Sequence, residues 1–167
     1  MKTIDVCVSP DLMHLYDVEN RTVVVIDILR ATSCMVTAFA HGALSITPFS
    51  NLEECRRMKS KGYLTSGERN GERVPGFDKG NSPFEYMGEQ VKGQKIAFTT
   101  TNGTQAIEKA KEAKQIVVGS FLNLTTVTHH LLLSEHNILV VCARKEGIFQ
   151  IDFPFPAGAD YKNIVLT

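Results

Sequence analysis

The chain has 167 residues, and its 18 Lys and Arg residues balance 18 Asp and Glu residues to a formal net charge of zero. A neutral chain has no overall attraction to nucleic acid or to an anionic membrane, which argues against both classes of partner. The longest apolar run, 23–29, is interrupted by Asp27 and is much shorter than the ~20 residues that span a bilayer. Acidic residues come too early for a secretory signal, so we expect a cytoplasmic protein.

The remaining composition predicts one main domain with a single sizeable core, and cysteines in the reduced thiol form. A hydrophobic content of 43% supplies enough apolar surface for a single core in a chain of this length. The four cysteines lie far apart, without the paired spacing of a zinc site or a disulfide framework, at positions Cys7, Cys34, Cys55 and Cys142.

In chain order, the first half alternates between strand and helix patterns. Residues 3–8 and the β-branched run 22–29 predict strands, the second of the kind that a parallel sheet buries on both faces. Thr32 or Ser33 is expected to cap a helix that runs to about His41. Residues 44–49 predict a strand, and a capping pattern at 50–53 opens a helix that Gly62 would end.

The second half begins with a long segment, 66–83, that is rich in glycine and charge and has neither a helical nor a strand period. A helix is expected to start at Ser82-Pro83. The elements that follow are predicted as a strand at 95–99, a helix at 102–113, a strand at 115–119, a helix at 123–135 and a strand at 137–142. This alternation predicts an α/β protein with a three-layer α/β/α arrangement and a mostly parallel or mixed sheet.

Asp27 is the strongest candidate for a functional residue. It lies near the end of the most apolar predicted strand, where an acid is costly unless it is paired or holds a metal ion. A structural pair with Arg30 is the alternative. Position 29, where aspartyl-nucleophile phosphatases carry a second Asp, is a leucine, which disfavours covalent aspartyl catalysis. The chain also lacks the nucleophile signatures of cysteine and histidine phosphatases.

The stretch TTTNGT at 99–104 follows another predicted strand. It combines hydroxyl groups, a glycine that lets the backbone approach a ligand, and the free N–H groups of a starting helix, which together suit a phosphate group. It has no lysine and is therefore not a Walker A loop. The alternative is purely structural, with Asn102 capping the helix and Gly103 easing the turn.

The segment 66–83 brings acids, cations and amides together. Its carboxylates suit Mg²⁺, which binds a few oxygen ligands together with water and substrate phosphate. Arginine suits phosphate or sulfonate, because its planar fork makes paired hydrogen bonds to such anions. A solvated surface loop is the alternative, although the length of the segment favours a function.

Seven stretches, in order and at matching spacing over nearly all of residues 1–143, resemble the 2-phosphosulfolactate phosphatase family of coenzyme M biosynthesis. They are SPDL (9–12), VVVIDILRATS (23–33), GERNG (67–71), GFDKGNSP (76–83), TTTNGT (99–104), GSFLN (119–123) and VCA (141–143). The resemblance implies an α/β/α fold and a Mg²⁺-dependent hydrolase that converts (2R)-2-phospho-3-sulfolactate to sulfolactate and phosphate.

With this resemblance, the candidate residues take specific roles. We expect Asp27, Arg30 and Glu68 to be catalytic, and Asp27, Glu68 and the weaker candidate Asp78 to hold Mg²⁺, while an activated water attacks phosphorus. The substrate, a small anionic phosphate ester, is expected to contact Arg69, Asn70, Asn81, Ser82, Thr100, Thr101, Asn102, Gly103 and Thr104.

The segment 144–167 departs from the family pattern, so we divide the chain into a domain at 1–143 and a divergent C-terminal tail at 144–167. Two alternatives to the phosphatase follow from this divergence. One is a relative that binds anions without turnover, and the other is a chain whose exposed apolar surface is covered by homo-oligomerisation. A phosphatase for another phosphorylated hydroxy acid is a further alternative.

Overall fold

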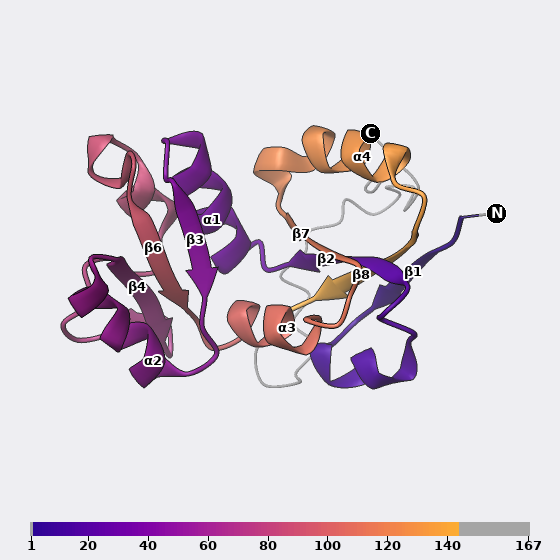
Figure 1. Cartoon of the computed structure of the whole chain (residues 1–167), viewed down its shortest axis with the longest axis horizontal. Coiled ribbons are helices and arrows are strands. Elements are labelled where there is room, and N and C mark those ends of the chain that lie inside the picture. Colours follow the sequence, from indigo (N-terminus) through magenta and orange to yellow (C-terminus); the bar gives the residue numbers. More distant parts are fainter. Residues whose placement is uncertain (1, 144–167) are drawn as a thin grey trace.

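The computed structural model describes residues 2–143, and the predicted tail at 144–167 lies outside the described residues. The strands within this range form two four-stranded sheets that lie beside each other along the long axis of the molecule (Figure 1). The predicted α/β class with mostly parallel strands is confirmed, and the division into two sheets is a feature that the sequence patterns did not indicate.

The first sheet is entirely parallel and has the strand order β1-β8-β2-β7. Its strands are β1 (Ile4–Cys7), β2 (Arg21–Ile26), β7 (Gln115–Gly119) and β8 (Asn137–Cys142). The central strand β2 is a β-branched run with Val23 and Val25 fully buried on one face and Val24 buried on the other. A strand that is apolar on both faces requires a cover on each side, and both faces of this sheet are covered.

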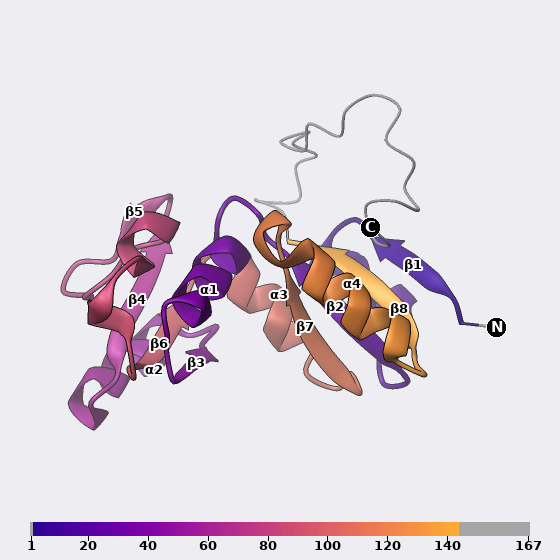
Figure 2. The ribbon, with the colours of Figure 1, turned by 90° about the horizontal axis from the view of Figure 1, so that it is seen from above.

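Helices cover the first sheet on both faces (Figures 1 and 2). The 3-10 helix η1 (Pro10–Leu15) and helix α3 (Gly103–Lys109) lie on one face, where Met13 and Ala106 pack with Val23 and Val25. Helix α4 (Leu124–Leu133) lies on the other, where its Val127 and Leu131 pack with Val24. The predicted three-layer arrangement is therefore present around this sheet.

The second sheet has the strand order β3-β6-β4-β5. Strands β3 (Ser45–Pro48), β6 (Lys95–Thr99) and β4 (Leu64–Arg69) are parallel, and the short β5 (Glu72–Arg73) is antiparallel to β4. Helix α1 (Ala31–Ala40) and the 3-10 helix η3 (Pro83–Tyr86) cover one face, with Met35 and Tyr86 packed against Phe98. Helix α2 (Leu52–Arg57) and the 3-10 helix η2 (Met58–Lys61) cover the other. Short 3-10 helices at Glu89–Val91 and Phe121–Asn123 complete the elements.

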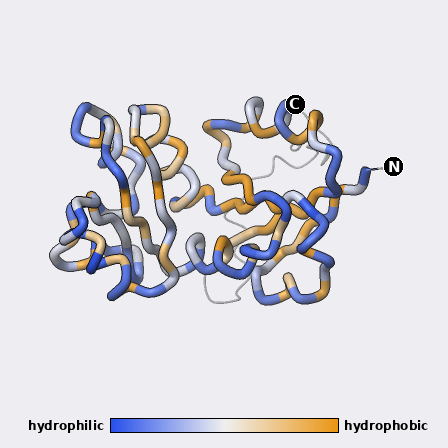
Figure 3. Tube along the Cα trace, in the orientation of Figure 1, coloured by the Kyte–Doolittle hydropathy of each residue, from blue (hydrophilic) through white to orange (hydrophobic). Residues whose placement is uncertain are grey.

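Within residues 2–143 the chain passes between the sheets twice. It leaves β2 of the first sheet through residues 27–30 and enters α1, which covers the second sheet. It returns from β6 of the second sheet through residues 100–102 into α3, which covers the first. Hydrophobic residues follow the strands of the first sheet and hydrophilic ones gather in the outer turns (Figure 3). No helix in the described range is long and apolar enough to cross a membrane.

The segment 66–83, predicted to be irregular, contains the end of β4 and a hairpin to β5. The two residues of the hairpin turn, Asn70 and Gly71, have φ angles of +56° and +81°. A two-residue turn with both φ angles positive matches the twist of antiparallel strands and favours Asn-Gly. This dipeptide was the sequence signal that could have predicted the hairpin.

Two helix starts in the structure also differ from the predicted ones. Helix α1 begins at Ala31 without a side-chain cap, because the Thr32 hydroxyl instead accepts a hydrogen bond from the Asp27 backbone N–H at 3.0 Å. Pro83 begins only a short 3-10 helix, and the Glu85 carboxylate reaches back to the Gly80 N–H at 2.9 Å. The strands predicted at 95–99, 115–119 and 137–142 are confirmed residue for residue.

Candidate functional site

The candidate site lies where the two crossovers between the sheets approach each other, because Gly103, just after the second crossover, adjoins Asp27 in the first. One crossover carries Asp27 and Arg30 beyond the carboxyl end of β2, and the other carries Thr100 and Thr101 beyond the carboxyl end of β6. Glu68 comes from β4, beside β6 in the second sheet. Ligands of parallel sheets bind beyond these strand ends, so the topology brings together three of the predicted clusters.

The side chain of Asp27 lies against the first residues of two helices. A Cβ atom placed on Gly103, the first residue of α3, would be 2.9 Å from Asp27 Oδ2 and 2.7 Å from the Cβ of Ala31, the first residue of α1. Burial raises the pKa of Asp27 to about 6, the amides of Ala31, Arg30 and Gly103 oppose this rise, and the charge of Glu68 adds to it. The two carboxyl groups are therefore electrostatically coupled.

Glu68 is 6% exposed and its carboxylate is held by two backbone amides. Oε1 accepts from the Thr101 N–H and Oε2 from the Gly71 N–H, both at 2.8 Å. Burial acts to raise the pKa of Glu68, but these amides, the Thr101 hydroxyl and the charge of Arg69 together outweigh burial and hold the pKa below its ordinary value. Glu68 is consequently a fixed, ionised carboxylate that joins the β4–β5 hairpin to the β6–α3 loop.

The TTTNGT loop uses most of its hydroxyl groups for its own structure. Thr100 and Thr104 are 1% exposed, and the Thr104 hydroxyl donates to the Thr100 carbonyl at 2.8 Å while the Thr100 hydroxyl accepts from the Thr104 N–H at 3.2 Å. Asn102 precedes α3 but makes no side-chain capping hydrogen bond. The Thr101 hydroxyl instead lies beside the Glu68 carboxylate, and its hydrogen bonding helps to lower the pKa of that carboxyl group.

The two candidate arginines have different surroundings. Arg30 reaches from the first crossover to the hairpin turn and donates to the Gly71 carbonyl at 3.2 Å. Arg69 donates to the Glu68 carbonyl at 2.6 Å and to the Thr99 hydroxyl at 3.0 Å. Arg30 therefore links the sheets, whereas the Arg69 guanidinium is held at the carboxyl edge of β4 and β6. Asn70 occupies the left-handed position of the turn and is exposed.

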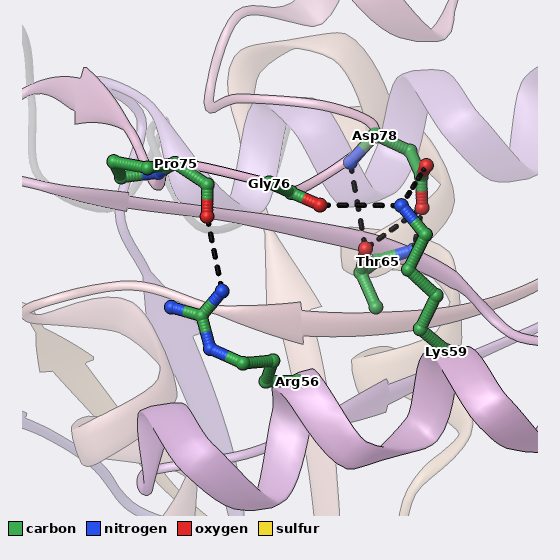
Figure 4. Close-up of polar contacts among 6 residues, drawn as sticks. All are labelled: Arg56, Lys59, Thr65, Pro75, Gly76 and Asp78. Atoms are coloured by element: carbon green, nitrogen blue, oxygen red, sulfur yellow. Dashed lines mark hydrogen bonds and ion pairs between the residues drawn. The ribbon is translucent and has the colours of Figure 1, made fainter.

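The fold does not bring Asp78 close to Asp27 and Glu68. Its Oδ1 pairs with the Lys59 ammonium at 2.7 Å, and its Oδ2 accepts from the hydroxyl and the N–H of Thr65 at 2.7 and 2.9 Å (Figure 4). Thr65 and Glu68 are three residues apart on β4, so their side chains point to opposite faces. Asp78 thus ties its loop to β4 and η2 on the face that α2 covers.

Asn81 and Ser82 lie where the chain enters η3. Asn81 is 9% exposed, and its Oδ1 is buried with no hydrogen-bond partner in the described part of the chain. The preceding carbonyl, of Gly80, accepts hydrogen bonds from the Ser66 and Tyr86 hydroxyls at 3.1 and 2.6 Å. Ser82 precedes η3 and makes no side-chain capping hydrogen bond. Sequence reasoning missed the contribution of Ser66 and Tyr86, which fix this segment from the interior.

The donor atoms at the crossovers fit a hard divalent cation. Among residues 2–143 no three or more His, Cys, Asp and Glu side chains are grouped to hold a metal. Mg²⁺ does not require such a group, since it commonly binds one or two protein carboxylates and completes its shell with water and phosphate oxygens. The carboxylates of Asp27 and Glu68, which interact with each other electrostatically, match this preference.

The fold and the site together define an α/β protein with charged strand-end loops suited to a small anionic ligand. Residues 7–165 match the family model described as 2-phosphosulpholactate phosphatase. A probable 2-phosphosulfolactate phosphatase of Thermotoga petrophila is 44% identical over 161 residues, which are 96% of this chain and 68% of the relative. The protein of the same name from Thermotoga maritima is 45% identical with the same coverage. The chain belongs to the 2-phosphosulfolactate phosphatase family, as the motifs indicated.

A third relative, a probable 2-phosphosulfolactate phosphatase of Caldanaerobacter subterraneus subsp. tengcongensis, is 41% identical over 152 residues. These residues are 89% of this chain and 63% of the relative. The chain therefore spans about two thirds of the length of the relatives it matches.

Proposed function

We propose that this protein is a phosphoric monoester hydrolase that converts 2-phosphosulfolactate to sulfolactate and phosphate with the help of Mg²⁺. The observation that carries the proposal is the meeting of Asp27 and Glu68 at the amide-rich loop between β6 and α3, with Arg30 bound to the hairpin turn that also holds Glu68. Family membership and the names of the relatives support the choice of substrate.

Asp27 and Glu68 would hold the cation. Two coupled carboxylates repel each other unless a positive charge lies between them, and the raised pKa of Asp27 reflects this repulsion and, above all, burial. The amides that bind Glu68 keep its carboxylate ionised and pointed in one direction. The cation, when bound, would supply charge compensation on the phosphoryl oxygens and favour deprotonation of the attacking water.

The substrate carries three anionic groups and needs donors for each. Arg30 would bind one of them, since its guanidinium uses one donor for the Gly71 carbonyl and has others to offer. Arg69, with the backbone of residues 100–104, would bind another. In this arrangement water attacks phosphorus directly, and the arginines stabilise the charge that develops on the phosphoryl oxygens.

Phosphate release tests this proposal. The purified full chain is incubated with 2-phosphosulfolactate in the presence of Mg²⁺ or of EDTA, and with phosphorylated hydroxy acids that lack the sulfonate group. We expect phosphate release that requires Mg²⁺ and is fastest with 2-phosphosulfolactate, the substrate that carries the sulfonate group. Binding of inorganic phosphate without turnover would instead identify an anion-binding relative, and faster turnover of another ester would change the assigned substrate.

We also propose a cytoplasmic protein that acts on a small molecule, without nucleic-acid or membrane partners. The balanced charge and the lack of a membrane-crossing helix in residues 2–143 support this. Homo-oligomerisation belongs to the same proposal, because β1 carries the partly exposed apolar residues Ile4 and Val6 on the outer edge of the first sheet. Sedimentation at several protein concentrations measures the oligomeric state.

A further inference from the structure

The proposed function leaves one of the three anionic groups of the substrate without a donor. Arg30 and Arg69 serve two of these groups, beside the strand-end loops. A further donor is expected close to Glu68, because phosphate, carboxylate and sulfonate are joined by a short carbon chain. Arg73, on the short strand β5, lies in this position, although the sequence patterns did not indicate it.

Arg73 extends from the same face of the second sheet as Glu68. The two residues lie directly opposite each other in the antiparallel pairing of β4 and β5, and side chains paired in this way share one face. That face is covered by α1 and η3, because Ser66, two residues before Glu68, binds the hydroxyl of Tyr86 in η3. Arg73 is therefore on the side of the sheet where the Glu68 carboxylate is coupled to Asp27.

The guanidinium of Arg73 has donors that the fold does not use. Its Nη1 lies 3.9 Å from Glu85 Oε2, which is beyond hydrogen-bond distance, and within residues 2–143 Arg73 donates no hydrogen bond. The Glu85 carboxylate instead accepts from the Gly80 N–H at 2.9 Å. The side chain of Arg73 is 58% exposed, so its planar fork is open to a ligand that enters from solvent.

Glu85 places this arginine beside the crossover residues. Burial raises the pKa of the Cys34 thiol in α1, the charge of Arg30 opposes this rise, and the charges of Asp27 and Glu85 add to it. These three charged side chains therefore lie around one buried residue, and Arg73 contacts the last of them. Arg73 is thus at the margin of the candidate site, on the side of η3.

The segment beside Arg73 also holds an unsatisfied polar group. A Cβ atom placed on Gly80 would be 3.2 Å from the Cβ of Arg73, so this segment passes directly against β5. The next residue, Asn81, is 9% exposed, and its Oδ1 has no hydrogen-bond partner in the described range. Buried carboxamides are normally satisfied, and a carboxamide can turn to present its NH₂ group in place of its oxygen. A polar group of a ligand is therefore expected next to Arg73.

We propose that Arg73 binds the sulfonate group of 2-phosphosulfolactate and thereby determines the preference for this substrate. The inference rests on the proposed function, which supplies the substrate. Of the two groups other than phosphate, the sulfonate is the farther from phosphorus along the carbon chain, which suits an arginine at the margin of the site. Sulfonate and guanidinium are both ionised at any physiological pH, and the planar fork of arginine makes paired hydrogen bonds to such an anion.

The test measures phosphate release by the full chain from 2-phosphosulfolactate and from 2-phospholactate, which lacks the sulfonate. We expect Arg73→Met to lower kcat/KM for 2-phosphosulfolactate by about 10- to 100-fold, the effect of losing a hydrogen bond between charged groups. The kcat/KM for 2-phospholactate should stay unchanged. Most of the loss should be in KM, because the charge of the sulfonate does not change during hydrolysis.

Two further variants control this result. Arg73→Lys keeps the charge without the planar fork and should lose only part of the activity toward 2-phosphosulfolactate. Arg57→Met removes an exposed arginine at the end of α2, on the opposite face of the second sheet, and should act on both esters normally. Thermal unfolding of Arg73→Met should match that of the unchanged protein, since the exposed contact with Glu85 contributes little stability.

An equal loss with 2-phospholactate would overturn the inference. If that loss vanishes with the phosphate ester of 2-hydroxyethanesulfonate, which lacks the carboxylate, Arg73 is the carboxylate ligand. If it persists there too, Arg73 serves the phosphate or the fold. Unchanged kinetics of Arg73→Met would show that its guanidinium does not contact the substrate. Failure of the proposed function is distinct, because the unchanged protein would then release no phosphate from 2-phosphosulfolactate.

Discussion

At the scale of single residues, Asp27 combines a cost in stability with the proposed function. Its carboxyl group is largely buried between the starts of α1 and α3, and burial raises its pKa to about 6 from the ordinary 3.8. The folded protein therefore binds the Asp27 proton more tightly than the unfolded chain does. Stability falls as the pH rises from about 4 to about 6, and above this range the ionised carboxylate imposes its full cost.

Asp27→Asn should separate these two effects. The amide has the same shape but never ionises, so we expect the metal-free variant to be more stable at pH 7.5 by about 1–3 kcal/mol, the free energy of a shift of about 2 pKa units reduced for partial relaxation. At the same time, Mg²⁺-dependent phosphate release should fall at least about 100-fold, because the variant loses a charged ligand. Urea unfolding in EDTA and a phosphate assay measure the two quantities.

The pH dependence provides the control for this variant. The stability difference between Asp27→Asn and the unchanged protein should shrink toward zero near pH 4, where the unchanged carboxyl group is mostly protonated in the folded state. An Asn variant that is less stable at both pH values, or one with near-normal turnover, would contradict the role given to Asp27.

Asp78 presents the opposite case, an acid that the structure uses to hold the fold. Burial acts to raise its pKa, but the hydrogen bonds from Lys59 and Thr65 outweigh burial and lower it. Its stabilising contribution is therefore present at neutral pH and is lost as the pH falls through the lowered pKa, below the ordinary 3.8. The side chain is 34% exposed, so solvent weakens the pair with Lys59.

We expect Asp78→Asn to lower the free energy of unfolding by about 1 kcal/mol at pH 7 and to leave Mg²⁺ affinity unchanged. Denaturant unfolding and a calorimetric titration with Mg²⁺ check the two parts. A loss of Mg²⁺ affinity comparable to that of Asp27→Asn would restore Asp78 as a metal ligand, as the sequence had predicted.

At the scale of elements, the site depends on how closely α1 and α3 approach each other. Gly103 permits this approach, because a Cβ atom at this position would overlap the Ala31 Cβ at 2.7 Å and Asp27 Oδ2 at 2.9 Å. Gly103→Ala must therefore push the start of α3 away from Asp27. We expect a loss of about 1–3 kcal/mol in stability and at least about a tenfold loss of phosphate release.

A second substitution, in α1, should partly restore the stability that this variant loses. Combining Gly103→Ala with Ala31→Gly removes one of the two overlaps and should recover part of the lost stability. Gln105→Ala, at an exposed position two residues after Gly103 in the same turn of α3, should leave stability and turnover unchanged. Additive losses in the double variant would show that the helices do not meet through these two residues.

The elements themselves were largely predictable from local patterns, and the site was predictable in its members more than in its arrangement. Apolar runs in the sequence predicted β2, β6 and β8, because each of these strands is buried on both faces. The hairpin at Asn70-Gly71 was missed because glycine and charge suggested a loop, although the dipeptide favours a tight turn. The partner of Asp78 could not be predicted, since Lys59 lies 19 residues away and only the folded sheet brings them together.

At the scale of the whole molecule, the two sheets are linked through the site. Within residues 2–143 the chain crosses between the sheets twice, and both crossovers carry site residues. Helix α1 covers the second sheet and also packs against Val118 of β7 in the first. Glu68 and Arg30 add hydrogen bonds between the crossovers and the hairpin. A site assembled from both halves in this way keeps its geometry only while both halves are folded.

This linkage predicts that the two sheets unfold as one cooperative unit. Leu131 of α4 is 2% exposed and packs with Val24 and Val140 on the first sheet. Leu131→Ala should lower the free energy of unfolding by about 2–5 kcal/mol, the usual cost of deleting a buried leucine side chain. Because α1 joins the halves, backbone amides of β4 and β6 in the second sheet should lose the same protection free energy as those of β8 in the first.

Native-state hydrogen exchange measures this protection strand by strand. Equal losses in both sheets would show that the site is stabilised by the entire described fold, and phosphate release should then decline at the same temperature at which either sheet opens. Protection retained in β4 and β6 while β8 opens would show two independent units. In that case Glu68 would stay in place while Asp27 moved with the first sheet, and Mg²⁺ affinity would fall well before the second sheet unfolded.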